Sequence, residues 1–143
     1  KILFGINTFS KNTNEYYNSL MVINNKFEIL SKYKFTVAFE NMRDVPGYIT
    51  EKIFDAFFSG TVPIYLGAND ILDYIPKNCF IDMRDFDSYE QLYFFIKNID
   101  DSEYQNYINN INSFLSSDAA KRFDIDCFVK TISFEILNDV NCI

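Results

Sequence analysis

The stretch FTVAFENMRDVPGYITEKIFDAFFSGTVPIYLG, residues 35–67, decides the fold of this chain. It begins with FTVAFE, residues 35–40, an apolar run of strand length that is rich in aromatic and β-branched residues. A polar loop and a helical pattern over residues 50–59 follow, and VPIYL, residues 62–66, has the length of a second strand. Strands separated by a helix pair in parallel through a right-handed crossover, so the stretch predicts the centre of an α/β fold.

The helix in this stretch has a predicted start, end and apolar side. Thr50 is a residue type that caps helix N-termini, and Gly60 is the type that follows helix C-termini. The apolar residues between them recur at helical spacing and predict the buried face of the helix. This face consists of Ile53, Phe54, Phe57 and Phe58.

The sequence upstream of this unit is less clearly patterned. Within residues 1–25, ILFGI is compatible with a strand, whereas YYNSLMVI has no clear assignment. KFEILSKY, residues 26–33, predicts a short amphipathic helix with Phe27 and Leu30 on one face.

Downstream of the unit, strand and helix signals alternate. Two S-x-x-Q capping boxes mark helix starts. The alternation predicts a single α/β domain, a Rossmann-like parallel sheet with flanking helices. The predicted elements are a helical turn ended by Pro76, a strand at residues 79–83, helices from Ser88 to about Ile99 and from Ser102 to about Leu115, and an amphipathic helix at residues 124–137.

Composition excludes several classes of site. The net charge is −7 and no basic run occurs, which argues against nucleic acid as a partner. His is absent, so Ser-His-Asp and Cys-His catalysis and the usual zinc sites are excluded. The three cysteines are widely spaced, as we expect of reduced thiols in a cytosolic protein. No run approaches the ~18 apolar residues of a transmembrane helix, so no such segment is expected.

The loop after the first strand of the opening stretch is the strongest candidate for a ligand site. Ligands of open parallel sheets bind beyond the carboxyl ends of the strands, and residues 41–50 connect such an end to a helix N-terminus. Free N–H groups there attract anions. Lys52 opposes the helix dipole, a cost that an anionic ligand would offset, whereas Glu51 suits a first turn in any case. The pair therefore indicates either a solvated helix start or a ligand site.

Other candidates have ordinary structural explanations. Asp85 and Asp87 form a D-x-D arrangement that can hold a metal with a nucleotide sugar, but they also precede a capped helix. The four glycines form neither G-x-G-x-x-G nor a Walker loop, which argues against a dehydrogenase or a P-loop NTPase. One set of apolar residues at helical spacing favours a core face over a stacking surface: Tyr104, Tyr107, Ile108 and Ile111.

Five sequence elements, in the right order, resemble the α-1,3/1,4-fucosyltransferase family, glycosyltransferase family 10. The nucleotide-sugar domain of that family shows F-x-x-x-F-E-N, Y-[IV]-T-E-K, G-x-V-P-[IV]-x-x-G, D-[YF]-I-P and D-F. The match is close over residues 33–100 and poor over residues 1–25. The corresponding stretches here are residues 35–41, 48–52, 60–67, 73–76 and 85–86.

The resemblance implies a fold and a ligand. The family has a two-domain GT-B fold whose C-terminal, Rossmann-like domain binds GDP-fucose, and residues 1–143 resemble that single donor-binding domain. We expect the N-terminal acceptor domain to lie outside this chain and the chain alone to be inactive. The implied donor-binding positions are Asn41, Arg43, Tyr48, Thr50, Glu51 and Lys52.

Each implied position has a chemical role. Lys52 would neutralise the diphosphate, and Glu51 would accept hydrogen bonds from ribose or fucose hydroxyls. Asn41 and Tyr48 would orient the diphosphate and the sugar, while Thr50 would cap the helix and offer its hydroxyl. The family also places a diphosphate-binding arginine upstream of its F-E-N motif. That arginine has no counterpart here, and Arg43 in the loop is the expected substitute.

The implied function is the inverting transfer of L-fucose from GDP-fucose to a glycan hydroxyl by direct displacement. The base resembles a residue of the N-terminal domain, so no catalytic residue is expected in this chain. No cofactor is implied, and a metal requirement is left open. A bacterial cell-surface glycan such as lipopolysaccharide is the expected acceptor, and a cytoplasmic site, peripheral to the inner membrane face, is the expected location.

Two alternatives remain at this point. One is a related GT-B transferase that uses another nucleotide sugar. The other is a non-catalytic domain that keeps the fold, favoured by the lack of the base and the arginine and opposed by the intact Y-I-T-E-K.

Overall fold

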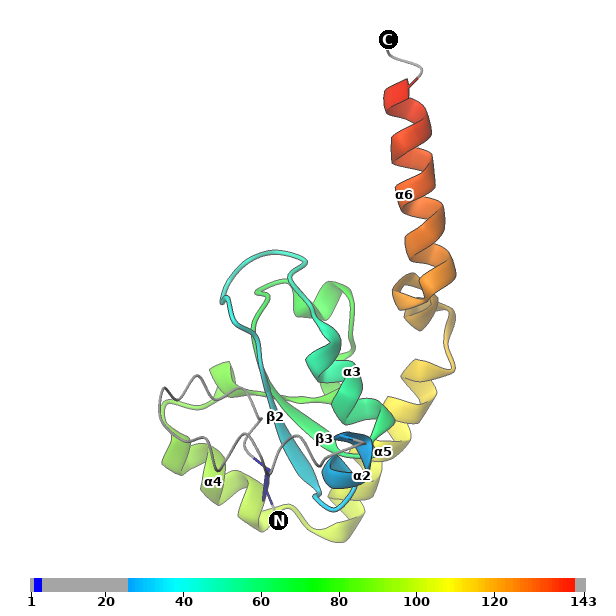
Figure 1. Cartoon of the computed structure of the whole chain (residues 1–143). Helices are drawn as coiled ribbons and strands as arrows, with labels where there is room; N and C mark the ends of the chain where they lie inside the picture. Colours follow the sequence, from blue (N-terminus) through cyan, green and yellow to red (C-terminus); the bar gives the residue numbers. More distant parts are fainter. Residues whose placement is uncertain (1, 4–25, 141–143) are drawn as a thin grey trace, which may run out of the picture.

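A parallel sheet forms the centre of the molecule (Figure 1). The computed structural model describes residues 2–3 and 26–140. The strands lie in the order of the sequence, and β2 pairs with β3 over its whole length, from Phe35 opposite Val62 to Phe39 opposite Leu66. The predicted α/β fold with a parallel sheet is therefore confirmed. The strands are β1 (Ile2–Leu3), β2 (Phe35–Phe39), β3 (Val62–Leu66) and β4 (Ile81–Asp82).

Helices follow or connect these strands. Short 3-10 helices fill the connections around β4 and precede the last helix. None of the helices in the described residues is both long and apolar enough to cross a bilayer. The α-helices are α2 (Lys26–Leu30), α3 (Glu51–Phe58), α4 (Tyr89–Asn98), α5 (Asp101–Leu115) and α6 (Ile125–Val140); the 3-10 helices are η1 (Ile71–Asp73), η2 (Lys77–Cys79), η3 (Met83–Asp85) and η4 (Asp118–Phe123).

Two hydrophobic clusters cover the two faces of the sheet. On one face, α3 and α5 pack against Tyr65 of β3. On the other face, α4 packs against Val62 and Ile64. Both faces of β3 are thus buried, which is why its sequence is apolar without alternation. The predicted core face of α5 is confirmed, since Ile111 is 1% exposed and its neighbours in the predicted set pack against the two clusters.

Several predicted boundaries were wrong by a few residues. The third predicted strand is shorter than residues 79–83, because η2 ends at Cys79 and η3 begins at Met83. The N-cap of α5 is Asp100, which accepts a hydrogen bond from the Glu103 N–H at 2.7 Å, and Ser102 lies inside the helix. Asp100 and Glu103 fit the same capping pattern two residues earlier, and the electrostatic preference of a first turn for acidic residues favours them.

The apolar face of α3 also differs from the prediction. Ile53 and Phe57 are buried and Phe54 packs against the same core cluster, but Phe58 is 65% exposed and Ala56 is buried instead. Gly60 follows the helix with φ of 69°, the left-handed conformation expected of a residue in this position. The helix therefore starts and ends as predicted, but its buried side is shifted by part of a helical turn from the predicted one.

The upstream expectations are tested only in part. The strand expected in ILFGI is confirmed at Ile2–Leu3, and the other expectations for residues 4–25 lie outside the described residues. The helix expected at residues 26–33 is present but ends at Leu30, which is buried, while Phe27 is 38% exposed.

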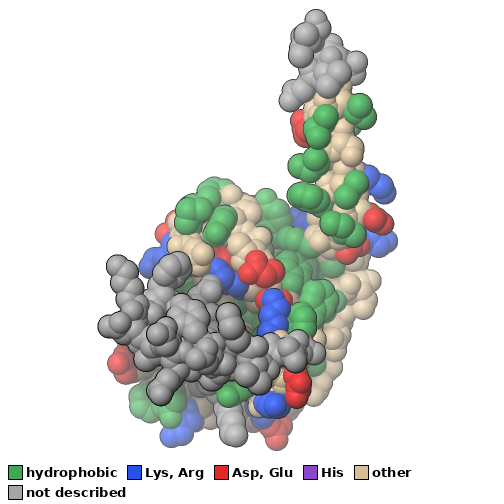
Figure 2. Space-filling model, viewed as in Figure 1, with side chains coloured by type: hydrophobic (Ala, Val, Ile, Leu, Met, Phe, Trp, Pro, Cys, Tyr) green, Lys and Arg blue, Asp and Glu red, His purple; other side chains and the backbone are tan. Residues whose placement is uncertain are grey.

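The last helix, α6, projects away from the body of the molecule (Figure 1). Its presence confirms the predicted amphipathic helix. Its large apolar side chains are exposed, and Figure 2 shows them on the surface of the projecting helix. These exposed side chains are Ile125, Phe128, Val129, Ile132, Phe134, Ile136 and Leu137.

Candidate functional site

A buried carboxylate organises the carboxyl edge of the sheet. Glu40 directly follows β2, and its backbone N–H continues the ladder by donating to the Leu66 carbonyl at 2.8 Å. Its side chain is completely buried. The carboxylate accepts two hydrogen bonds from Thr50, one from the backbone N–H to Oε1 at 2.8 Å and one from the hydroxyl to Oε2 at 2.6 Å. The end of β2 is therefore joined directly to the start of α3.

Lys52 points to the same carboxylate. Its ammonium lies 3.3 Å from Glu40 Oε2 and donates to Asn41 Oδ1 at 3.0 Å. The Lys52 side chain is 17% exposed, so the charged group is held at the edge of the protein interior. The unfavourable position of a lysine in the first turn of α3 thus has a partner within the chain, and an anionic ligand is not needed to explain it.

The expected capping role of Thr50 was wrong in its detail. Thr50 occupies the N-cap position of α3, but its side chain accepts no hydrogen bond from the first turn. The hydroxyl donates to Glu40 instead. A helix start with its N–H groups left without a side-chain cap keeps the positive end of the dipole available to an anion.

Gly67 makes room for this arrangement. A Cβ on Gly67 would lie 2.5 Å from Glu40 Cγ and would also collide with the Tyr65 hydroxyl. The Tyr65 oxygen accepts a hydrogen bond from the Ala68 N–H at 3.0 Å. Burial raises the pKa of Tyr65 to about 12, so the hydroxyl stays protonated at neutral pH. A glycine at the end of β3 therefore lets two buried side chains from neighbouring strands come together.

The loop between Glu40 and Thr50 folds over the end of β3. Asp44 adopts φ of 59° and donates its N–H to the Gly67 carbonyl at 3.1 Å. Gly47, with φ of 69°, donates its N–H to both carboxylate oxygens of Asp70, at 2.9 and 3.0 Å. These two anchors hold the loop to the segment after β3, so the loop has a defined position beside the start of α3.

A second buried carboxylate lies at the end of β4. Asp82 accepts from Arg84 at 2.9 and 3.2 Å from Nε and at 2.8 Å from Nη2. Arg84 also donates to the Ala68 carbonyl at 3.1 Å, and Lys77 lies 3.5 Å from Asp82. Burial by itself would raise the pKa of Asp82, but the hydrogen bonds and charge of Arg84, with the charge of Lys77, bring it below the ordinary value. This ion pair braces the segment that follows β3.

The structure brings some of the predicted site residues together and not others. Asn41, Thr50 and Lys52 are joined through Glu40 and the Asn41 amide. Tyr48, which is close to these residues in the sequence, is half-buried, and its N–H donates to the Val45 carbonyl.

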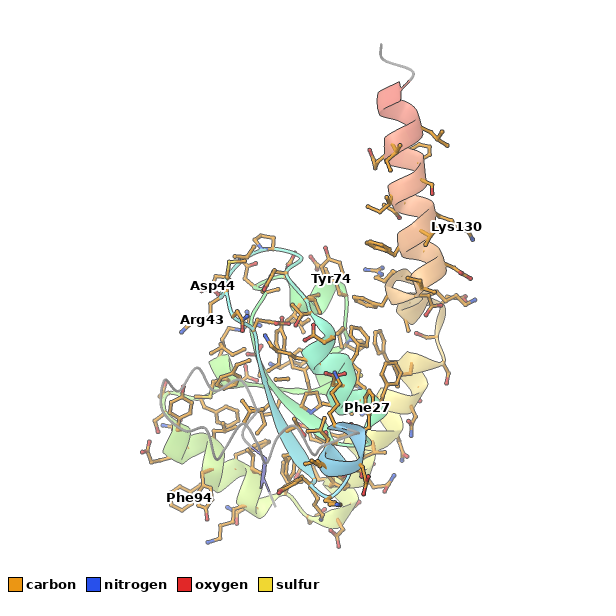
Figure 3. All side chains as sticks on the ribbon, viewed as in Figure 1. Phe27, Arg43, Asp44, Tyr74, Phe94 and Lys130 are labelled. Atoms are coloured by element: carbon orange, nitrogen blue, oxygen red, sulfur yellow. The ribbon has the colours of Figure 1, made fainter. Side chains whose placement is uncertain are left out.

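Glu51 and Arg43 are exposed, and Figure 3 places Arg43, with Asp44, on the loop that follows β2. Neither side chain joins the contacts of Glu40 that the structure describes. Sequence reasoning missed Glu40, although a charged residue that ends an apolar strand was a signal for it.

The D-x-D pair makes structural contacts, and the two described cysteines are free thiols. Asp85 pairs with Lys77 at 2.5 Å, and Asp87 contacts the Gln91 side chain at the start of α4. In the described residues no group of three His, Cys, Asp or Glu side chains could hold a metal ion. Cys79 is a free, buried thiol whose pKa burial raises to about 11, and Cys127 is also free.

Comparisons with known proteins point to one family. A family model described as glycosyltransferase family 10 (fucosyltransferase), C-terminal, matches residues 3–126. An alpha-(1,3)-fucosyltransferase FucT from Helicobacter pylori is 39% identical over 98 residues, 63% of this chain and 20% of the relative. An alpha-(1,4)-fucosyltransferase from Arabidopsis thaliana is 43% identical over 72 residues, 50% of this chain and 18% of the relative. The chain thus spans about a fifth of the length of these curated relatives.

Solved structures agree with these sequence matches. A crystal structure of an alpha1,3-fucosyltransferase with GDP-fucose superposes with a TM-score of 0.54 and 28% identity. The match covers 66% of this chain and 36% of that chain.

Proposed function

Because the chain belongs to glycosyltransferase family 10, the fucosyltransferases, we propose that the carboxyl edge of its sheet binds the GDP part of GDP-fucose. The observation that supports this most strongly is the start of α3. There a helix N-terminus without a side-chain cap lies next to an ammonium group that is fixed by Glu40 and Asn41. Both features attract a diphosphate.

The diphosphate is the part of the donor that these groups suit. Lys52 has three ammonium protons, of which two are directed at Glu40 and Asn41, so one remains for a phosphate oxygen. The N–H groups of the first turn of α3 supply further donors. Arg43, exposed on the loop, is the proposed second cation for this group.

Residues that contact the sugar hydroxyls, and residues of the loop, complete the proposed site. Glu51 is exposed in the first turn of α3 and accepts hydrogen bonds from ribose or fucose hydroxyls. Tyr48 and Asn41 orient the diphosphate and the fucose. The role of Thr50 is indirect, because its hydroxyl already donates to Glu40.

The proposed reaction is the inverting transfer of L-fucose to a glycan hydroxyl. As the bond to GDP breaks, negative charge grows on the diphosphate, and Lys52 with the α3 N-terminus stabilises that charge. A base removes the acceptor proton, and we place this base outside the domain. In support, the buried carboxylates at this edge, Glu40 and Asp82, are each engaged with cations.

The acceptor and the place of action are also proposals. A bacterial relative, from Helicobacter pylori, is consistent with a cell-surface glycan such as lipopolysaccharide as the acceptor. We place the reaction at the cytoplasmic face of a bacterial membrane, with peripheral association. A second domain that binds the acceptor completes the enzyme.

Calorimetric titration of the chain with GDP tests the donor site. We expect binding by the wild type and about tenfold weaker binding by Lys52→Met, which keeps most of the side-chain volume and removes the charge. Absence of binding by the wild type contradicts the proposal.

Titrations with GDP-fucose, GDP-mannose and UDP-sugars identify the donor. Preference for GDP-fucose supports the fucosyltransferase, and preference for another nucleotide sugar indicates a related transferase. Binding of none of these ligands indicates a domain that has kept the fold without the chemistry.

A further inference from the structure

We infer that Glu40 is a positioning residue of the donor site, which acts on the diphosphate through Lys52 and Thr50 without touching it. This inference rests on the proposed function and adds a residue to it. Glu40 follows β2, whereas its partners lie 10 and 12 positions later at the start of α3. The contact therefore fixes the position of the helix start relative to the sheet.

The burial of Glu40 is the first step in the argument. Its side chain has no exposure, and a buried carboxylate is costly unless hydrogen bonds and an opposite charge satisfy it. Thr50 and Lys52 supply these partners. These partners of the carboxylate both lie on the segment that opens α3. A buried carboxylate bound in this way orients that segment relative to the sheet.

The first consequence concerns the helix N-terminus. A threonine at an N-cap position ordinarily accepts a hydrogen bond from the first turn of its helix. Here the Thr50 hydroxyl donates to Glu40 at 2.6 Å, and its side chain caps nothing. Glu40 thereby leaves the N–H groups of the first turn available to an anion.

The second consequence concerns the lysine. Lysine side chains have four rotatable carbon–carbon bonds and lose much entropy when they are ordered. Glu40 and Asn41 together hold the Lys52 ammonium in one place before any ligand arrives. Binding of the diphosphate then does not have to order this side chain.

The distances indicate that Glu40 stays in place when the ligand binds. Its bonds from Thr50, at 2.8 and 2.6 Å, are shorter than the 3.3 Å contact with Lys52. The carboxylate is held mainly by its two bonds from Thr50, and its side chain is completely buried. Glu40 is therefore a fixed anchor for Lys52.

The test is calorimetric titration of the full 143-residue chain with GDP for four proteins: wild type, Glu40→Gln, Lys52→Met and the double variant. Glutamine has almost the shape of glutamate and still accepts from the Thr50 N–H, but it has no charge to hold Lys52. We expect about tenfold weaker binding for each single variant. The double variant should bind within about twofold of Lys52→Met, because glutamine keeps the hydrogen bond from the Thr50 N–H and Glu40→Gln therefore removes mainly the hold on Lys52.

Several outcomes overturn the inference. Independent effects would multiply to about a 100-fold loss in the double variant, which would indicate a general structural role. Tighter binding by Glu40→Gln would indicate that Glu40 competes with the ligand for Lys52. Wild-type affinity in Glu40→Gln, with weak binding by Lys52→Met, would remove the role of Glu40 and leave the proposed function standing. Absence of GDP binding by the wild type would instead remove the proposed function, and this inference with it.

A matched control and a second variant complete the design. Asp55, also on α3, pairs with Lys26 at 2.5 Å, so Asp55→Asn makes the same chemical change in another ion pair and should leave GDP affinity within about twofold of wild type. If Glu40→Gln does not fold, Thr50→Val breaks the same contact from the other side. We expect about tenfold weaker GDP binding for Thr50→Val and recovery in Thr50→Ser, which restores the hydroxyl. Wild-type affinity in Thr50→Val would overturn the inference.

Discussion

At the residue scale, the main finding is that Lys52 and Glu40 explain each other. Lys52 lies where the helix dipole disfavours a cation, and Glu40 lies where burial disfavours an anion. Their contact, with the hydrogen bonds from Thr50, offsets both costs. Two residues that look unfavourable when considered separately form a local arrangement that leaves one ammonium proton for a ligand.

Substitution of Gly67 should disturb this arrangement by direct contact with Glu40. In Gly67→Ala the added Cβ meets Glu40 Cγ and the Tyr65 hydroxyl, both buried, so one of them must move. We expect a loss of about 1–3 kcal/mol in the free energy of unfolding, measured in urea, and weaker binding of GDP.

Gly60→Ala is the matched control for this change. Its Cβ meets nothing within 4 Å, but the φ of 69° strains an alanine. It should therefore cost about 1 kcal/mol of stability and leave GDP affinity unchanged. Unchanged stability of Gly67→Ala would contradict the close packing of Glu40 and Tyr65 around Gly67.

The Asp82–Arg84 pair should make stability depend on acid pH. The folded-state pKa of Asp82 lies below the ordinary 3.8, so its contribution is fully present above that value and is lost as the pH falls through the folded-state pKa. Asp82→Asn should lose about 3 kcal/mol at pH 7, because Arg84 loses its partner, and should show a flatter pH profile below pH 4.

The comparison for this prediction is Asp85→Asn. Asp85 contacts the same Lys77, but its side chain is 53% exposed, and the change should cost less than about 0.5 kcal/mol. Unfolding free energies of the three proteins from pH 7 to pH 2 provide the measurement. A wild-type profile as flat as that of Asp82→Asn would contradict the assignment.

At the element scale, the start of α5 separates two capping hypotheses. The sequence favoured Ser102, whereas the structure has Asp100 accepting from the Glu103 N–H. Asp100→Ala should therefore cost about 1 kcal/mol in urea unfolding, and Ser102→Ala should stay within about 0.5 kcal/mol of wild type. The reverse order of the two losses would restore the sequence-based cap.

The elements themselves were largely predictable, because their signals are local. The strand at Phe35–Phe39 and the helix at Glu51–Phe58 follow from apolar runs and periodicity within a few residues. Their faces and ends were less predictable. Phe58 is exposed while Ala56 is buried, because contacts with the sheet and α5 decide which side of α3 is covered.

At the scale of the whole molecule, α6 is separate from the core. Among its described side chains only Cys127 is half-buried, and the rest are exposed. A chain that ends after Asp124 should therefore keep the melting temperature and GDP affinity of the full chain, because no core surface is lost. Differential scanning calorimetry and titration with GDP measure both.

A shorter chain that ends after Ser117 is the contrast. It loses Ala120, which is buried, and Phe123, which lies 4.6 Å from the Phe54 ring centroid. We expect this chain to melt at a clearly lower temperature. A similar loss in the chain that ends after Asp124 would show that α6 packs against the body in solution.

The candidate site was predictable only in part. The family motifs identified Asn41, Thr50 and Lys52, which the structure joins. The motifs also contain Glu40, and its place at the end of an apolar strand was a signal, but nothing local indicates that its carboxylate contacts Thr50. The brace between Arg84 and the Ala68 carbonyl spans 16 positions and has no local signal.

By itself the sequence determined the order of strands and helices, the parallel sheet and the segment that joins the end of β2 to the start of α3. These features depend on residue periodicity and turn preferences, which act between near neighbours in the chain. Only the tertiary structure decided that Glu40 fixes Thr50 and Lys52 and that Gly67 leaves room for it. The reason is that parallel pairing of β2 with β3 brings together residues that are far apart in sequence, and burial then determines which charges must find partners.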